Sequence, residues 1–269
     1  MADEDRGTPA EIPEGSGIPP PEELPPELEA TLTEIFPIDV ASPIEADTDE
    51  HSILPFLTVG IGASAGGLEA YMELLAALPP TTGMAYILVP HLSAEFESHL
   101  PEILSRHTRM PVEEIQSGIR PEPNRVHVLP AGKRVIMQGG MLHLERRPID
   151  GRPSMPIDRF FRSLAADQKN RAIGVVLSGA DSDGALGLSA IKGEGGISIV
   201  QDPETAKFEE MPRSGISADH VDMILAPGLI ALELARLASE FQRPQLRPLE
   251  DGRLVDGCLL YTSPSPRDS

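Results

Sequence analysis

The sequence is poor in the residues that bind nucleic acids or form disulfides. Its 269 residues include no tryptophan, one cysteine (Cys258), and 22 Lys and Arg against 42 Asp and Glu, for a formal net charge of −20 at pH 7. Phosphates of nucleic acids and anionic membrane surfaces would repel so acidic a chain, so we expect neither as a partner. A single cysteine excludes an intrachain disulfide, which is typical of the reducing cytoplasm.

Long apolar runs are also missing. No stretch approaches the roughly 20 apolar residues that span a bilayer, and the start Met-Ala-Asp-Glu-Asp lacks the basic and apolar regions of a signal peptide. We therefore expect a cytoplasmic protein with no direct membrane insertion. No His or Cys pair has a zinc-site spacing such as H-E-x-x-H or C-x-x-C, so we expect no metal and no cofactor.

Composition divides the chain into four parts. Residues 1–52 are acidic and rich in proline with few apolar residues, which predicts a disordered segment. Residues 53–242 are predicted to form a globular domain, and residues 243–257 a linker. Residues 258–269 resemble the translation of a sequencing-library adapter, so we expect this end to be an artefact and exclude it from the fold.

Short apolar runs alternate with amphipathic stretches through the predicted domain. This pattern predicts an α/β fold, a doubly wound and mostly parallel sheet with helices on both faces. Residues 134–137 and 141–145 flank Gln-Gly-Gly and predict an inserted β-hairpin. The other expected strands are 56–61, 85–89, 125–129, 172–177, 197–200 and 223–225, and the expected helices are 68–78, 96–106, 157–167, 185–192 and 229–241.

A candidate nucleophile follows the first expected strand. Gly62-Ala-Ser64-Ala-Gly66 fits G-x-S-x-G, a pattern that holds a serine on a sharp turn between a strand and a helix. The N–H groups at the start of the next helix are suited to stabilising an oxyanion. Ser64 is therefore a candidate nucleophile, although a plain glycine-rich turn would have the same residues.

The same segment also fits a dinucleotide-binding fingerprint. Gly60-x-Gly62-x-x-Ala65 matches G-x-G-x-x-G/A, which expects an acidic residue at the end of the second strand to bind the ribose. The second strand here is followed by His91, and the first acid is Glu95. The ribose ligand is thus missing, and a dinucleotide-binding oxidoreductase is the less favoured alternative.

His91 and two aspartates complete a candidate triad. Loops after successive parallel strands gather at one edge of the sheet, where the His91 imidazole could accept the Ser64 proton. Asp181 and Asp183 follow a later core strand, and either could orient the imidazole. Alternatively, Ser182 or Asp183 could cap the next helix. The residues alone do not choose between the two aspartates, and the order Ser, His, Asp differs from that of α/β-hydrolases.

These loops together resemble the catalytic domain of the chemotaxis CheB methylesterase family, over residues 56–237. The resemblance implies Ser64 as nucleophile, His91 as general base and Asp183 as orienting acid, because the family's aspartate directly precedes Gly-Ala. It also implies hydrolysis of glutamate γ-methyl esters, with deamidation of glutamine, on the cytoplasmic helices of methyl-accepting chemoreceptors. The motifs that carry it are Gly60-Ile-Gly-Ala-Ser-Ala-Gly-Gly67, Pro90-His91, Met155-Pro-Ile-Asp-Arg-Phe-Phe161, Val176-Leu-Ser-Gly-Ala-Asp-Ser-Asp-Gly-Ala185, Gln201-Asp202 and Glu210-Met-Pro-Arg213.

The sequence departs from the family pattern at several positions. Ala65 stands where the family has threonine, Pro90 where it has glutamine, and Ser178-Gly-Ala-Asp181 where it has Thr-Gly-Met-Gly. A catalytically impaired scaffold or binding module is therefore a second alternative. Residues 1–52 are too short for the family's usual phosphoacceptor domain, and the layout resembles an esterase fused to a following CheR-type methyltransferase module.

Overall fold

The structure, a computed structural model, describes most of the predicted domain. The predicted disordered segment 1–52, most of the linker 243–257 and the adapter-like end 258–269 lie outside the described residues and stay predictions. The described residues are 53–91, 99–146, 155–218 and 221–243, with the short strands at 247–248 and 254–255.

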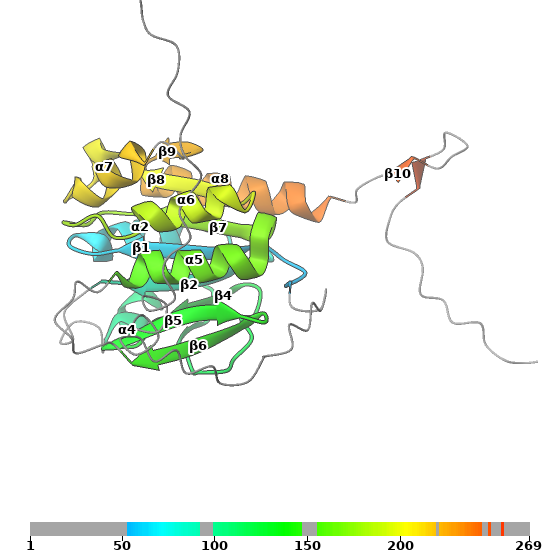
Figure 1. The fold of residues 1–269 in the computed structure, drawn as a ribbon, viewed down its shortest axis with the longest axis horizontal. Helices are drawn as coiled ribbons and strands as arrows, with labels where there is room; N and C mark the ends of the chain where they lie inside the picture. Colours follow the sequence, from blue (N-terminus) through cyan, green and yellow to red (C-terminus); the bar gives the residue numbers. More distant parts are fainter. Residues whose placement is uncertain are drawn as a thin grey trace, which may run out of the picture. The chain divides into compact units, whose positions relative to one another are not determined.

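A sheet of seven parallel strands forms the centre of the domain, in the order β3-β4-β2-β1-β7-β8-β9 (Figure 1). The central strands β1, β2 and β7 are buried along their whole length, which explains their nearly continuous apolar sequence. The strands are β1 (Thr58–Ala63), β2 (Ala85–Pro90), β3 (Val112–Glu114), β4 (Arg125–Val128), β7 (Ala172–Val176), β8 (Ile197–Gln201) and β9 (Met223–Leu225).

Helices connect the strands and cover both faces of the sheet. None of the helices in the described ranges is long and apolar enough to cross a membrane. The α-helices are α2 (Gly67–Ala77), α4 (Leu100–Leu104), α5 (Pro156–Gln168), α6 (Ala185–Gly193), α7 (Glu210–Ser217) and α8 (Pro227–Gln242), and the 3-10 helices are η1 (Lys169–Arg171) and η2 (Pro203–Thr205).

The core lies in two layers, one on each side of the sheet. On one side α2 packs against α8 and both bury apolar side chains such as Leu74 and Leu234. On the other side α5 lies beside α6 (Figure 1), with Phe161 and Leu188 buried between them and the strands. Helices on both faces of a parallel sheet confirm the predicted α/β fold.

The predicted hairpin is present as β5 (Lys133–Gln138) and β6 (Met141–Arg146), which pair antiparallel. It packs against α5 rather than joining the main sheet. Asp167 of α5 accepts hydrogen bonds from Gly139 N at 2.6 Å and Gly140 N at 3.0 Å, so the turn of the hairpin is fixed to the helix.

Some short helices and strands were not predicted from the sequence. β3 has three residues, none of them buried, so it lacks the apolar run of a core strand. α7 contains Pro212 and Gly215, which are poor helix formers. The helix expected over 96–106 is described only as α4, since 92–98 lie outside the described residues. The predicted linker includes a two-residue strand pair, β10 (Arg247–Pro248) with β11 (Leu254–Val255).

Gly62 of β1 allows α5 to pack closely against the strand that leads to Ser64. A Cβ at Gly62 would lie 2.4 Å from Ile157 Cγ2, and the Ile157 side chain is fully buried. We expect Gly62→Ala to lower the free energy of unfolding by about 1–3 kcal/mol, as overpacked cores do. Chemical denaturation measures this loss.

Gly193 provides the matched control. It lies in the last turn of α6, and a Cβ there would meet no atom within 4 Å. Gly193→Ala should be neutral or stabilise the domain by up to about 1 kcal/mol, because alanine favours helix. Equal effects of the two substitutions would contradict the packing explanation.

Candidate active site

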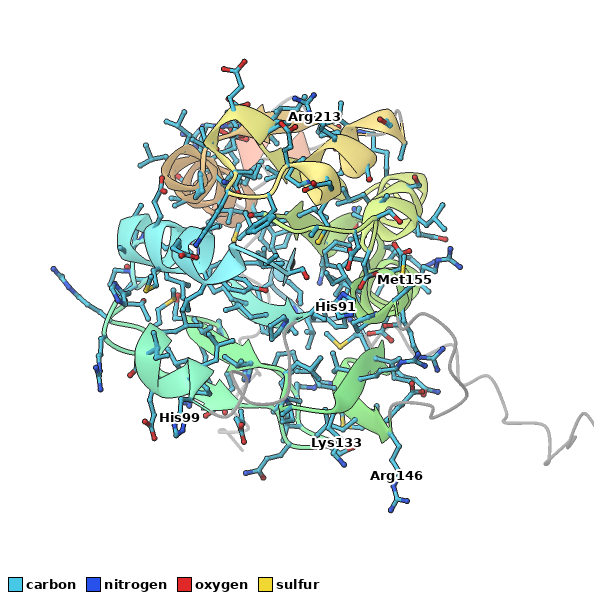
Figure 2. The ribbon with its side chains drawn as sticks, turned by 90° about the vertical axis from the view of Figure 1, so that its left-hand side faces the viewer. His91, His99, Lys133, Arg146, Met155 and Arg213 are labelled. Carbon is cyan, nitrogen blue, oxygen red and sulfur yellow. The ribbon has the colours of Figure 1, made fainter. Side chains whose placement is uncertain are left out.

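The ends of the central strands bring three loops to one edge of the sheet. Ala63 of β1 is in register with Pro90 of β2, and the His91 N–H donates to the Ala63 carbonyl at 2.7 Å. The Ser64 N–H donates to the Ser178 carbonyl at 2.9 Å. Main-chain pairing thus continues past the strand ends and sets Ser64, His91 and the loop after β7 side by side. His91 lies near the centre of the view in Figure 2.

Ser64 lies on the turn between β1 and α2. Its hydroxyl donates to the main-chain carbonyl of His91, with 3.0 Å between Oγ and O. Gly66 caps α2 with a φ of 70°, a left-handed conformation that glycine adopts without strain. The turn therefore places the hydroxyl beside His91 and next to the N–H groups and positive dipole end of α2.

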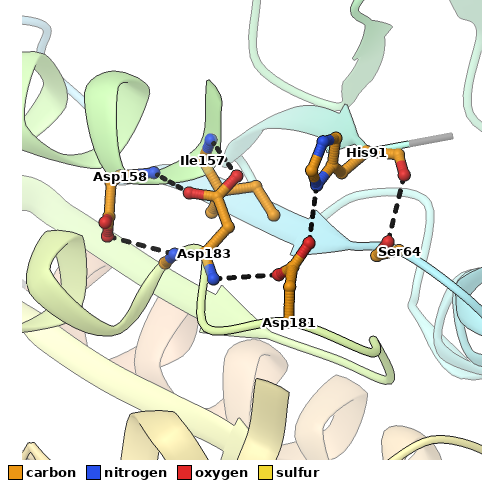
Figure 3. Close-up of polar contacts among 7 residues, drawn as sticks. Ser64, His91, Ile157, Asp158, Asp181 and Asp183 are labelled. Atoms are coloured by element: carbon orange, nitrogen blue, oxygen red, sulfur yellow. Dashed lines mark hydrogen bonds and ion pairs between the residues drawn. The ribbon is translucent and has the colours of Figure 1, made fainter. Parts of the chain in front are cut away.

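The imidazole of His91 is hydrogen-bonded to Asp181. Nδ1 lies 2.8 Å from Asp181 Oδ2, and the two side chains are 26% and 36% exposed. The hydrogen bond to His91 lowers the pKa of Asp181 below its ordinary value, which keeps the carboxylate ionised. The other oxygen, Oδ1, accepts from the Asp183 N–H at 2.9 Å (Figure 3). A carboxylate and an imidazole are thus held together at the same edge as Ser64.

Asp183 has a different position. Its Oδ2 accepts from Ile157 N at 3.0 Å and its Oδ1 from Asp158 N at 2.9 Å, both in the first turn of α5 (Figure 3). Asp158 in turn accepts from Gly184 N at 3.0 Å and Gly187 N at 2.7 Å at the start of α6. Asp183, in the loop before α6, therefore caps α5, and Asp158 of α5 caps α6; both carboxylates are buried.

The structure thus places Ser64 beside His91, but the carboxylates of the two aspartates have different hydrogen-bond partners. The carboxylate hydrogen-bonded to the imidazole is that of Asp181, whereas Asp183, which the family resemblance selects, caps α5. The physical reason is that a fully buried carboxylate needs strong donors, and the first turn of α5 provides two. Neither Ser182 nor Asp183 caps α6: its N-cap residue is Gly184, and the N–H groups at its start donate to Asp158. The catalytic roles of Ser64, His91 and Asp183 stay predictions.

Asp158 lies beside the candidate site, and its sequence position within Met155-Pro-Ile-Asp-Arg-Phe-Phe161 did not predict this. It lies in the first turn of α5 after a proline, a position where acidic residues usually serve their own helix. Its role in capping α6 depends on contacts with residues 26 and 29 positions away, which no local pattern reveals.

The loop before α7 forms another side of the site. The Ser178 hydroxyl donates to the Ala65 carbonyl at 2.8 Å, and the Phe208 N–H donates to Ser178 Oγ at 3.0 Å. Gly179 N donates to the Phe208 carbonyl at 3.1 Å, and Met211 N to the Gly179 carbonyl at 2.9 Å. Ser178 thus ties the serine turn to this loop, which helps to hold Ser64 in place.

Burial raises the pKa of Asp183 to about 6, although the N–H groups of α5 and the nearby His91 oppose this rise. Its ordinary value is 3.8. Because the folded-state pKa lies above that value, the folded state binds the proton more tightly between these two pH values. The contribution of Asp183 to stability is therefore full below about pH 4 and falls as pH rises to about 6.

The direction of this pH dependence can be tested with the variant Asp183→Asn. We expect the free energy of unfolding of the wild type, minus that of the variant, to fall between about pH 4 and pH 6. The fall should be at most about 3 kcal/mol, since one pKa unit corresponds to about 1.4 kcal/mol. Urea denaturation across this range measures it, and parallel curves for the two proteins would contradict the shifted pKa.

The sequence is similar to those of known proteins. The CheB methylesterase family model matches residues 59–234. Protein-glutamate methylesterase/protein-glutamine glutaminase 1 of Bordetella avium is 37% identical over 193 residues, which cover 71% of this chain and 55% of that protein. A putative protein-glutamate methylesterase/protein-glutamine glutaminase of Leptospira interrogans is 34% identical over 180 residues, which cover 66% of this chain and 92% of that protein.

A solved structure extends the likeness to the fold. The crystal structure of the Thermotoga maritima CheB methylesterase catalytic domain matches with a TM-score of 0.62 and 26% identity, over 68% of this chain and 98% of that one. The chain spans about half the length of the Bordetella avium relative, at 55%. The family model covers more than half of the chain and includes Ser64, His91 and both aspartates, so the chain belongs to the CheB methylesterase family.

Proposed function

We propose that this chain is a carboxylic ester hydrolase that removes methyl groups from glutamate γ-methyl esters of chemoreceptors, in chemotaxis-type signalling. Two relatives carry the name protein-glutamate methylesterase/protein-glutamine glutaminase. One observation carries the proposal. The Ser64 hydroxyl is hydrogen-bonded to the main chain of His91, and the His91 imidazole is hydrogen-bonded to a carboxylate. These groups lie at the edge where parallel sheets bind ligands. Glutamine deamidation at the same site is the second reaction.

In the proposed mechanism Ser64 Oγ attacks the ester carbonyl while the His91 imidazole takes its proton. A carboxylate from the loop after β7 holds the ring. The N–H groups near Ala65 and the start of α2 stabilise the oxyanion. His91 then returns the proton to the departing methoxide, which leaves as methanol. Water attacks the acyl-enzyme by the same route and releases the free glutamate and Ser64.

A change of hydrogen-bond partner precedes this chemistry. In the structure the Ser64 hydroxyl donates to the main-chain oxygen of His91, so it must leave this oxygen and donate to the ring before its proton can be transferred. Catalytic hydrogen bonds often form only in the complex with substrate. The His91 carbonyl thus holds the hydroxyl until the substrate arrives.

The proposed substrates are the cytoplasmic helices of methyl-accepting chemoreceptors, which place the reaction in the cytoplasm. The formal net charge of −20 disfavours nucleic acid as a partner. The chain acts on the receptor helices from solution in this proposal, and no insertion into the bilayer is needed.

Methanol release from receptor fragments with labelled methyl groups tests the function. We expect release in proportion to the amount of the full chain, well above the rate in buffer. A chain that binds the methylated fragments but releases no methanol above buffer would instead be the scaffold that the departures at Ala65, Pro90 and Ala180 allow.

A further inference from the structure

We propose that Asp181, and not Asp183, is the positioning residue that orients the His91 imidazole in this protein. The kinetic part of this proposal rests on the proposed function, whereas the part about the imidazole itself does not. It assigns a role to a residue that the family resemblance leaves without one.

The contacts of Asp181 are those that an orienting carboxylate requires. Oδ2 lies 2.8 Å from His91 Nδ1, and Oδ1 accepts from the Asp183 N–H at 2.9 Å. The main-chain bond fixes the carboxylate plane, so Oδ2 stays directed at the ring. An ionised carboxylate can only accept, so Nδ1 must carry the proton. Nε2 is then the basic nitrogen that can take a proton from Ser64.

Asp183 is engaged elsewhere. Both of its oxygens accept N–H bonds from the first turn of α5, at 3.0 and 2.9 Å, and the residue is fully buried. Turning this carboxylate toward His91 would leave two buried N–H groups without acceptors, which is costly. Asp183 therefore holds the loop after β7 against α5.

The sequence supports this division of roles. Asp181 stands where the family pattern has glycine, in Ser178-Gly-Ala-Asp181, so this chain has a carboxylate at a position that the pattern leaves without a side chain. Its side chain is 36% exposed, and solvent can therefore reach it. Within the described ranges, the titratable group that faces it is His91, and the neutral main-chain N–H of Asp183 also donates to it.

Proton NMR of the full chain tests the contact without any substrate. The hydrogen-bonded Nδ1–H of His91 should give a downfield signal in the wild type, assigned by its loss in His91→Ala. Asp181→Asn should remove the signal, because its amide N–H₂ would face Nδ1 and place the ring proton on Nε2. Asp183→Asn should unfold more easily but keep the signal.

Rates of methanol release test whether the orientation of the imidazole by Asp181 matters for catalysis. Asp181→Asn should lower kcat for methanol release by at least about 100-fold with little change in KM, because the wrong tautomer cannot accept the Ser64 proton. In Asp181→Gly the space is open to solvent, so added acetate should restore part of the rate in proportion to its concentration. A structural role alone would give no rescue.

The outcomes separate the two proposals. If the wild type releases no methanol, the proposed function fails, and the imidazole signal still decides the role of Asp181. If Asp181→Asn keeps the Nδ1–H signal, the role of Asp181 is refuted. The same holds if Asp183→Asn loses the signal in a protein that a dispersed spectrum shows to be folded.

Discussion

Ser64→Ala is expected to lower the rate of methanol release by at least about three orders of magnitude, as the loss of a triad serine does. The hydroxyl lies on the turn between β1 and α2, 3.0 Å from the His91 carbonyl, and the proposed acyl-enzyme forms on it. Single-turnover release from methylated receptor fragments measures the chemical step.

Ser182→Ala is the matched control for this substitution. Ser182 is an exposed serine in the neighbouring loop after β7, and we expect its loss to leave the rate near that of the wild type. The thermal midpoints of both variants should stay close to the wild-type value, because each change removes one hydroxyl, half-buried in Ser64 and exposed in Ser182. Near-wild-type release by Ser64→Ala would refute its role as nucleophile.

His91→Ala should reduce methanol release by a similar factor, about three orders of magnitude, since Ser64 loses its proton acceptor. Residues that act as one unit show strongly non-additive effects. The double variant Ser64→Ala/His91→Ala should therefore be hardly slower than either single variant. The measurement is a double-mutant cycle: the release rates of the wild type, the two single variants and the double variant at one pH.

His107→Ala controls for the loss of an imidazole, since His107 is exposed and follows α4 rather than a core strand. It should leave the release rate near that of the wild type. If the Ser64 and His91 effects simply multiplied in the double variant, the two side chains would be acting independently, and the proposed proton transfer between them would be excluded.

Much of the fold follows from local sequence signals. β1, β2 and β7 are apolar runs buried on both faces, and glycine turns or prolines mark where their neighbours begin and end. β3 could not be predicted because its three residues, Val-Glu-Glu, are mostly polar. It is a strand because β4 offers it a parallel partner, which is a tertiary effect.

The proximity of Ser64 and His91 was predictable because both follow strands that the sequence marks as buried. Ser64 and His91 each follow a buried parallel strand, so topology alone brings them to one edge. Which aspartate contacts the imidazole was not predictable from the residues, because Asp181 and Asp183 lie in one loop, and the path of that loop decides which carboxylate faces His91. Asp183 faces α5 because Ile157 and Asp158 offer their N–H groups there, and this contact joins residues 26 and 25 positions apart.

Labelling of the full chain with a serine-directed fluorophosphonate, followed by peptide mass spectrometry, examines directly whether His91 activates the Ser64 hydroxyl. We predict one phosphonyl adduct, on Ser64, which is absent in Ser64→Ala and forms far more slowly in His91→Ala. An adduct that forms at the wild-type rate in His91→Ala, or one that persists in Ser64→Ala, would contradict an activated serine at this edge of the sheet.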